Sequence, residues 1–244
     1  MADTVREIER KYEFAGEEES LPDLTGVPGV EAVVDKGTDA LDATYFDTAG
    51  QRLAADGITL RRRTGGDDAG WHLKLPVSPG VRDEIQAPPA EQIPARLTAL
   101  VRSRVRDSAL NPLVRIESRR TVCQLLGAEG ALLAEASIDR VTAKRLTGGE
   151  LRTAAWTEVE VELADGQEPA FLDAVEARLL EGGLRPSAAP SKLARALAET
   201  EPKAAKPAKK GEKAAKESAK KGGKKGKQAA KGKKAAKAPE PAPV

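Results

Sequence analysis

Two short segments place carboxylates on alternate residues. Residues 7–11 read EIERK and residues 158–162 read EVEVE. Successive side chains of a β-strand point to opposite sides, so the glutamates of each segment would share one face. Carboxylate oxygens are the ligands that Mg²⁺ or Mn²⁺ prefers in proteins. The predicted ligands of a divalent metal are Glu7, Glu9, Glu158, Glu160 and Asp139.

Basic side chains alternate in the same way on other segments. In "ITLRRRT", Arg61 and Arg63 share a face, and in "VRIESRR" Arg115, Glu117 and Arg119 do. The complete set of inward basic candidates is Lys11, Arg61, Arg63, Lys74, Arg82, Arg115 and Arg119. Arginine and lysine in such number suit a polyanion. A ligand that meets both needs is a metal-bound chain of phosphates, such as tripolyphosphate or a nucleoside triphosphate.

The elements that must position these residues are short strands separated by turn signals such as "DTAGQ" and "TGGDDAG". Alternation predicts strands near 4–14, 42–48, 57–64, 70–77, 81–86, 112–127, 131–146 and 151–165. Apolar residues at helical spacing predict helices within 90–105, 168–183 and 191–200. Strands joined by short turns favour an antiparallel meander, and eight of them are enough to close a barrel. The predicted fold class is α+β, an eight-stranded antiparallel β-barrel with flanking helices.

The direction of the charged faces decides what such a barrel does. If the apolar faces pack under the helices, the charged faces point inward and line a tunnel. Charges buried there must pair, hold metals or face a charged ligand. The alternative is a dry apolar barrel with its charges in water, but that arrangement does not explain why acidic and basic residues sort onto different strands.

Composition narrows the chemistry. The chain of 244 residues has one cysteine, Cys123, and one histidine, His72, which excludes a zinc site of the usual Cys/His type. Any metal must therefore be held by oxygen. No apolar run is long enough to span a bilayer, and the acidic start lacks the features of a signal peptide, so we expect a cytoplasmic protein without membrane contact.

The last part of the chain differs from the rest. Residues 201–244 hold 15 lysines against four glutamates, a net charge of +11, whereas residues 1–200 carry −9. The tail consists mainly of Lys, Ala, Gly and Pro, which predicts disorder. We expect a domain over 1–200 and a basic tail over 201–244. The tail would bind polyanions such as nucleic acid or polyphosphate without sequence preference, or act only as a solubilising extension.

Taken together, residues 1–200 resemble the CYTH superfamily, the triphosphate tunnel metalloenzymes. The family signature E-x-E-x-K is present at 7–11, and later strands are matched by "GITLRRRTGG", "GWHLKLP", "SRRTV", "IDRV" and "EVEVEL", with "SKLARAL" as the closing helix. The resemblance implies an eight-stranded tunnel that binds triphosphate through basic residues and Mg²⁺ or Mn²⁺ through glutamates. Its members act as inorganic triphosphatases, thiamine triphosphatases or class IV adenylyl cyclases.

The resemblance also implies roles for single residues. Glu7, Glu9, Glu158 and Glu160 correspond to metal ligands, with Asp139 near the metals. The phosphate contacts implied are Lys11, Arg61, Arg63, Lys74, Arg82, Arg115, Arg119 and Lys192, the last on the closing helix. The candidate catalytic groups are Glu160, Asp139 and Lys11. Two departures stand out: Glu117 lies where relatives carry another base, and a lysine-rich tail replaces the CHAD helical domain that often follows.

Three functions follow from these features. The first is metal-dependent hydrolysis of tripolyphosphate or a related triphosphate. The second is a module that binds polyphosphate without cleaving it, which Glu117 and the tail would favour. The third is a cyclase acting on ATP, although no segment marks an adenine pocket. His72 shares the inward face of its strand with Lys74, so it is either a proton donor or a structural residue.

Overall fold

The computed structural model describes residues 4–16 and 19–201. The strands are β1 (Thr4–Phe14), β2 (Ala32–Asp47), β3 (Thr59–Thr64), β4 (Gly70–Ser78), β5 (Val81–Ala87), β6 (Asn111–Leu126), β7 (Leu132–Arg145), β8 (Arg152–Leu163) and β9 (Leu184–Pro186). The helices are α1 (Arg52–Ala55), α2 (Ala95–Val105), α3 (Phe171–Glu181) and α4 (Lys192–Glu199), with 3-10 turns at Leu24–Gly26 and Ala128–Gly130. The predicted disorder of the tail concerns residues that lie outside the described part, apart from Glu201.

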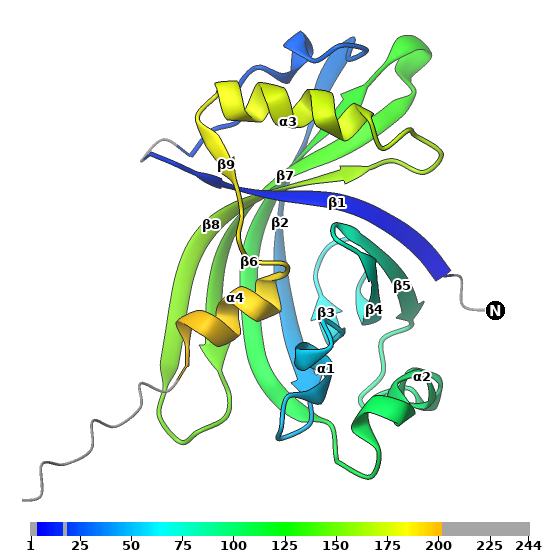
Figure 1. Cartoon of the computed structure of the whole chain (residues 1–244), viewed down its shortest axis with the longest axis vertical. Helices are drawn as coiled ribbons and strands as arrows, with labels where there is room; N and C mark the ends of the chain where they lie inside the picture. The colour runs from blue at the N-terminus through cyan, green and yellow to red at the C-terminus, as the bar shows by residue number, and fades with distance from the viewer. Residues whose placement is uncertain (1–3, 17–18, 202–244) are drawn as a thin grey trace, which may run out of the picture. The chain divides into compact units, whose positions relative to one another are not determined.

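The strands form one antiparallel sheet in the order β5-β4-β3-β2-β6-β7-β8-β1-β9 (Figure 1). An additional pairing of β5 with β1 brings the ends of the eight-strand order together, which confirms the predicted eight-stranded antiparallel tunnel. Strand β1 serves three neighbours along its length: residues 4–8 pair with β5, 9–12 with β8, and 12–14 with β9. The wall between β1 and β5 therefore ends where β1 turns towards β8.

Three elements differ from the prediction. Strand β2 begins at Ala32, ten residues before the predicted start, and pairs with β6 along its length with an irregularity between Asp35 and Gly37. Its first half is mostly exposed, so no apolar alternation marks it. Helix α1 and strand β9 have four and three residues and are too short to show a period.

Three apolar clusters hold the helices to the sheet. Helix α2 packs on the outward residues of β3 and β4, such as Leu60 and Trp71, and α3 packs on those of β1, β7 and β8. Helix α4 is different, because Leu193 and Ala196 pack on residues such as Ile116 and Val141. By alternation and register, Ile116 and Val141 lie on the same face of the sheet as Asp139, and this face is the tunnel side. Helix α4 therefore fills one end of the tunnel.

No helix of the described residues is both long and apolar enough to cross a membrane.

Candidate functional site

The tunnel contains a cavity of about 340 Å³ lined mainly by charged side chains. They come from the eight strands β1 to β8, from the turn after β3 and from α4. The charged residues of strands and helix around it are Glu7, Glu9, Lys11, Asp39, Arg61, Arg63, Lys74, Arg82, Glu84, Arg120, Glu135, Glu160, Glu162 and Lys192. This set includes both residue types that sequence assigned to the interior.

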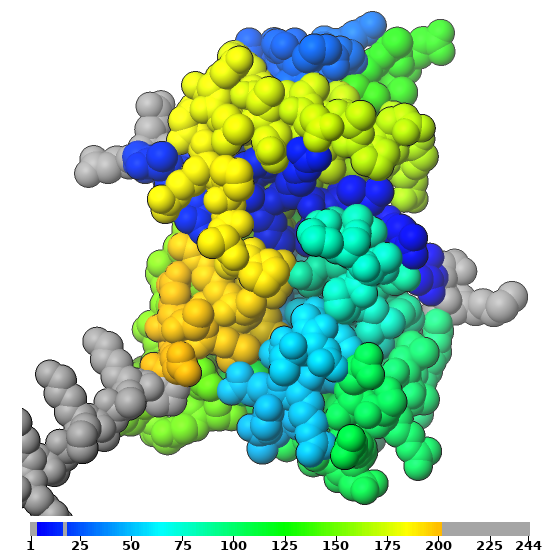
Figure 2. Space-filling view, in the orientation of Figure 1, coloured from blue at the N-terminus to red at the C-terminus, as the bar shows by residue number. Residues whose placement is uncertain are grey.

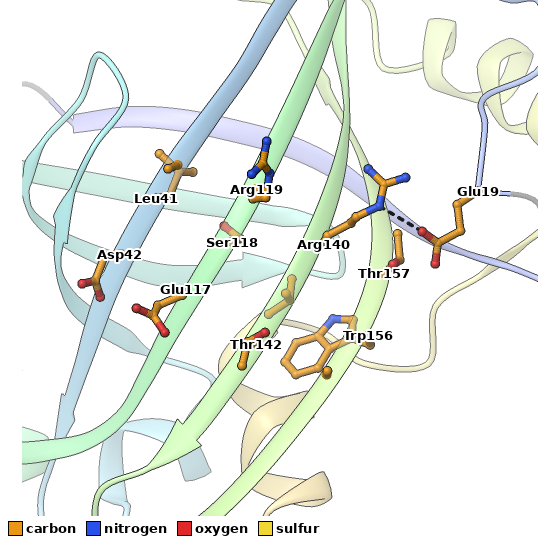
Figure 3. Close-up of a pocket in the computed structure, with 13 residues that line it drawn as sticks. Glu19, Leu41, Asp42, Glu117, Ser118, Arg119, Arg140, Thr142, Trp156 and Thr157 are labelled. Atoms are coloured by element: carbon orange, nitrogen blue, oxygen red, sulfur yellow. Dashed lines mark hydrogen bonds and ion pairs between the residues drawn. The ribbon is translucent and has the colours of Figure 1, made fainter.

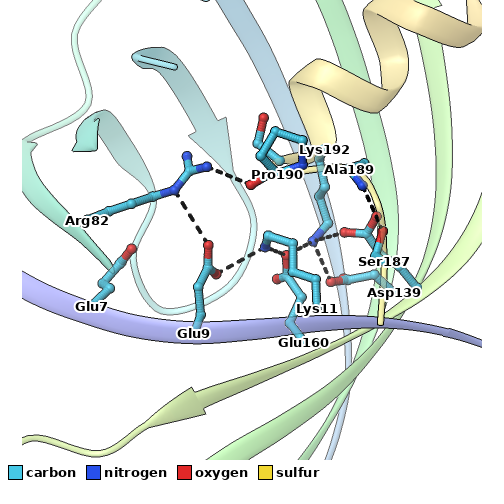
Figure 4. A network of polar contacts seen from close by, with 12 residues as sticks. Glu7, Glu9, Lys11, Arg82, Asp139, Glu160, Ser187, Ala189, Pro190 and Lys192 are labelled. Atoms are coloured by element: carbon cyan, nitrogen blue, oxygen red, sulfur yellow. Dashed lines mark hydrogen bonds and ion pairs between the residues drawn. The ribbon is translucent and has the colours of Figure 1, made fainter. Parts of the chain in front are cut away.

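Three carboxylates gather on β7 and β8, and we call Asp139, Glu158 and Glu160 the carboxylate trio. Antiparallel register places Asp139 opposite Glu158, and alternation puts Glu160 on the same face. All three are buried, and one oxygen from each lies within 4.8 Å of the others. Lys192 Nζ lies 2.9 Å from Asp139 Oδ2, 2.8 Å from Glu158 Oε1 and 2.7 Å from Glu160 Oε1 (Figure 4).

Two further cations neutralise the trio. Arg120 Nη2 donates to Asp139 Oδ2 at 2.7 Å and to Glu160 Oε2 at 2.5 Å. Lys11 Nζ donates to Glu160 and lies 3.1 Å from Glu9 Oε2. Burial alone would raise the pKa of Glu160, but the adjacent cations, Lys11 first, hold it well below its usual range. Glu160 is therefore ionised at neutral pH.

The opposite part of the lining is basic. Arg61 and Arg63 share one face of β3, and the Nε atom of each is buried without a hydrogen-bond partner among the described residues. Arg61 Nη1 lies 3.4 Å from the hydroxyl of Tyr45, and Arg63 pairs with Asp68. Burial, reinforced by repulsion from Arg61 and Arg120, lowers the pKa of Arg63 to about 9. Buried cations that repel each other and keep free N–H donors suit an anion.

A third group lies on β1, β4 and β5. Lys74 Nζ donates to Glu7 Oε2 at 2.5 Å, yet burial outweighs this ion pair and raises the pKa of Glu7 to about 7. Arg82 Nη2 donates to the carbonyl oxygen of Pro190 at 2.6 Å, and its Nε lies 3.7 Å from Glu9 Oε1. Arg82 thus links the tunnel wall to the segment that leads into α4.

His72 shares the inward face of β4 with Lys74, but it is buried and is not among the residues that line the cavity. Its Nδ1 lies 2.8 Å from Glu84 Oε1, and its Nε2 lies 2.8 Å from the carbonyl oxygen of Asp68. Glu84 also accepts a hydrogen bond from Gln86 at 2.9 Å. The imidazole therefore supports a lining residue and a turn, which favours the structural role over proton donation to a ligand.

The prediction that Arg115 and Arg119 face the tunnel is wrong. Arg115 is exposed and pairs with Asp42 at 2.6 Å and Glu117 at 3.0 Å. Arg119 and Glu117 line a groove on the outer side of the sheet (Figure 3). The inward base of β6 is Arg120.

The reason for this error lies in α4. Sequence reasoning assigned every charged strand face to the interior, but α4 makes one end of the tunnel apolar, so Ile116 and Val114 of β6 face inward there. Arg120 lies an even number of residues after them and therefore on the same face of β6. The available signal was that Arg120 is the one charged residue on the face that carries Val114, Ile116, Ser118, Val122 and Gln124.

Of the predicted site residues, the structure brings together Glu7, Glu9, Lys11, Arg61, Arg63, Lys74, Arg82, Asp139, Glu158, Glu160 and Lys192 in or directly behind the cavity lining. Sequence reasoning gave no role to Arg120.

Comparisons with known proteins identify the family of this chain. The CYTH domain family model matches residues 5–196. The uncharacterized proteins MT2285 and Rv2226 of Mycobacterium tuberculosis, from strains CDC 1551 / Oshkosh and H37Rv, are each 42% identical over 210 residues, which cover 80% of this chain and 41% of theirs. The chain thus spans about two fifths of the length of these relatives. A solved structure of a candidate adenylate cyclase from Bacillus halodurans shares the fold, with a TM-score of 0.50 and 18% identity over 78% of this chain and 96% of that one. The family match covers most of the chain, and the chain belongs to the CYTH domain family.

Proposed function

We propose that this protein hydrolyses inorganic tripolyphosphate or a related triphosphate in its tunnel with the help of Mg²⁺ or Mn²⁺. The observation that carries this proposal is the separation of charge around one cavity. Arg61 and Arg63 present buried N–H groups that have no partner within the described part of the chain, whereas Glu160 and its neighbours present carboxylate oxygens. A phosphate chain and a divalent cation need these two kinds of group side by side.

The residues present fit a hard divalent cation. The carboxylate trio offers oxygen atoms within 4.8 Å of one another, and Glu7 and Glu9 add oxygens from β1. Such a set suits Mg²⁺ or Mn²⁺ and not a soft metal. When bound, the metal would supply neutralisation of phosphate charge.

The chain's own residues supply the remaining steps. Arg61, Arg63 and Lys74 would hold phosphate oxygens and fix the direction of the chain in the tunnel. Glu160 lines the cavity in its ionised form and would accept a hydrogen bond from a water and orient it toward the terminal phosphorus, while Asp139 lies behind the cavity lining. Lys11 would donate to the phosphate from the same end.

The test is release of orthophosphate from tripolyphosphate with Mg²⁺ or Mn²⁺. Glu160→Gln keeps the shape of the side chain and should lower turnover by about 100-fold or more, because the charge that orients the water is lost. Glu117→Gln is the matched control, since Glu117 is exposed on the outer side of the sheet. Equal turnover in the two variants would refute the proposal.

The alternative of binding without hydrolysis loses one of its two motivations. It rested on Glu117 as an acid within the phosphate site, but Glu117 lies outside the tunnel and pairs with Arg115. Its other motivation, the basic tail, lies outside the described residues apart from Glu201.

A further inference from the structure

Lys192 takes a central position in the carboxylate trio. Its Nζ lies within 2.9 Å of an oxygen of each member. Arg120 contacts two members, and Lys11 contacts one. Lys192 is the first residue of α4 and only 9% exposed. A single ammonium therefore stands where the three carboxylates converge.

A divalent cation would need the same oxygens. Mg²⁺ binds oxygen at about 2.0–2.1 Å, so an ion shared by the trio would lie within a few ångströms of Lys192 Nζ. Two cations at such a distance in a buried site repel strongly. The ammonium and the metal are thus competitors for one place.

We propose that Lys192 is an internal cation that occupies the carboxylate trio until a divalent metal displaces it. This inference rests on the metal assignment of the proposed function. It adds that metal binding is coupled to the position of the Lys192 side chain. Metal binding would move the Lys192 side chain into the cavity, which Lys192 already lines. The displaced ammonium would then be available to a phosphate group.

The surroundings of Lys192 permit this movement. Helix α4 is anchored by Leu193 and Ala196 in an apolar cluster and is capped by Ser191 Oγ, which accepts from Ala194 N at 3.1 Å. The Lys192 ammonium lies among the carboxylates of the trio, and Lys192 lines the cavity. Its four methylene groups can swing while the helix stays seated.

Metal affinity without substrate tests the competition. We would titrate the full chain with Mn²⁺ by calorimetry and compare wild type with Lys192→Met. The variant should bind Mn²⁺ about 10-fold more tightly or better, because no ammonium has to leave. Lys144→Met is the matched control, since Lys144 is exposed on β7, on the face opposite to Asp139. We expect it to change the affinity by about threefold or less.

Thermal unfolding gives a second readout. Without metal, Lys192→Met leaves three buried carboxylates with two cations and should unfold at a lower temperature than wild type. Saturating Mn²⁺ should raise its midpoint by more than it raises that of wild type. An unchanged or weaker Mn²⁺ affinity in Lys192→Met, or equal gains in Lys192→Met and Lys144→Met, would overturn the inference.

A measurement on wild type covers the case in which the variant does not fold. Limited acetylation followed by peptide mass spectrometry should label Lys192 several-fold more in the presence of Mn²⁺, with the exposed Lys144 as the internal reference. Unchanged or reduced labelling of Lys192 would overturn the inference. These readouts use no substrate, so the two proposals can fail separately. Phosphate release without displacement of Lys192 would refute this inference and leave the proposed function standing. Displacement of Lys192 without phosphate release would support this inference and refute the proposed function.

Discussion

At the residue scale, the carboxylate trio of the tunnel is ion-paired, whereas some of the tunnel's arginine N–H groups have no hydrogen-bond partner among the described residues. Each member of the carboxylate trio contacts at least one cation, whereas Arg61 and Arg63 each keep a buried N–H group that no residue of 4–16 or 19–201 satisfies. Sequence could predict which of these residues share a strand face, because alternation fixes that. It could not predict which charges pair, because pairing depends on the register between strands distant in sequence, such as Lys11 of β1 with Glu160 of β8.

Arg63 allows a test of how far the buried arginines of the tunnel lower the free energy of unfolding. Arg63→Met should raise the free energy of unfolding by about 1 kcal/mol, because it removes a buried cation that Arg61 and Arg120 repel. The same change should weaken binding of tripolyphosphate by about 10-fold or more. Urea denaturation and calorimetry measure the two effects. Arg62→Met is the control, since Arg62 is exposed on the same strand and should change neither.

Glu7 predicts a dependence of stability on pH. Its pKa is raised from 4.5 to about 7, mainly by burial, so the folded protein holds this proton more tightly than the unfolded chain. Stability of the metal-free protein should therefore fall as pH rises from about 4.5 to about 7 and then level off as far as this group is concerned. Glu7→Gln should reduce that fall by on the order of 1–3 kcal/mol in urea titrations at pH 5 and pH 8. Identical slopes for wild type and variant would contradict the assignment.

At the element scale, strands with strict alternation were predictable and irregular ones were not. The predicted limits of β1 agree with the structure, and those of β7 and β8 agree within two residues at each end, because charged and apolar residues alternate through them. On β6 the alternation is present, but the identity of the inward face depends on α4. Leu193 of α4 packs against apolar residues of β6, so the apolar face of β6 points into the tunnel there. A strand pattern alone contains no information about what fills each end of a tunnel.

The turn between β3 and β4 offers a prediction at this scale. Gly65 has φ +80°, and a Cβ there would lie 2.0 Å from the carbonyl oxygen of Ala40 on β2. Gly65→Ala should therefore lower the free energy of unfolding by about 3 kcal/mol or more. Gly29→Ala is the control, because Gly29 has φ +89° but open space around its Cβ, so about 1 kcal/mol is expected. Chemical denaturation compares them, and equal losses would show that the close approach to β2 does not matter.

At the scale of the whole molecule, the chain joins an acidic domain to a basic tail. The net charges of −9 for residues 1–200 and +11 for residues 201–244 are properties of the sequence. The charge of the tunnel depends on folding, because residues from eight strands and α4 meet there. Composition could therefore predict a polyanion ligand for the tail without any fold, whereas the tunnel required the strand pattern.

Removal of residues 202–244 tests the role of the tail. The shortened protein should keep the midpoint of thermal unfolding and the rate of phosphate release, because the described strands and helices end at Glu199. Its affinity for duplex DNA should fall sharply, and the salt dependence of binding should become shallow. A DNA affinity unchanged by the truncation would contradict the prediction of a polyanion-binding tail.

The central claim is that the charged tunnel cleaves a phosphate chain. The most direct measurement is orthophosphate release from tripolyphosphate, with Mg²⁺ or Mn²⁺ and with a chelator, for wild type, Glu160→Gln and Glu117→Gln. The account predicts metal-dependent release by wild type and Glu117→Gln and its near loss in Glu160→Gln. Phosphate release that is unchanged by the chelator, or that persists in Glu160→Gln, would contradict this account.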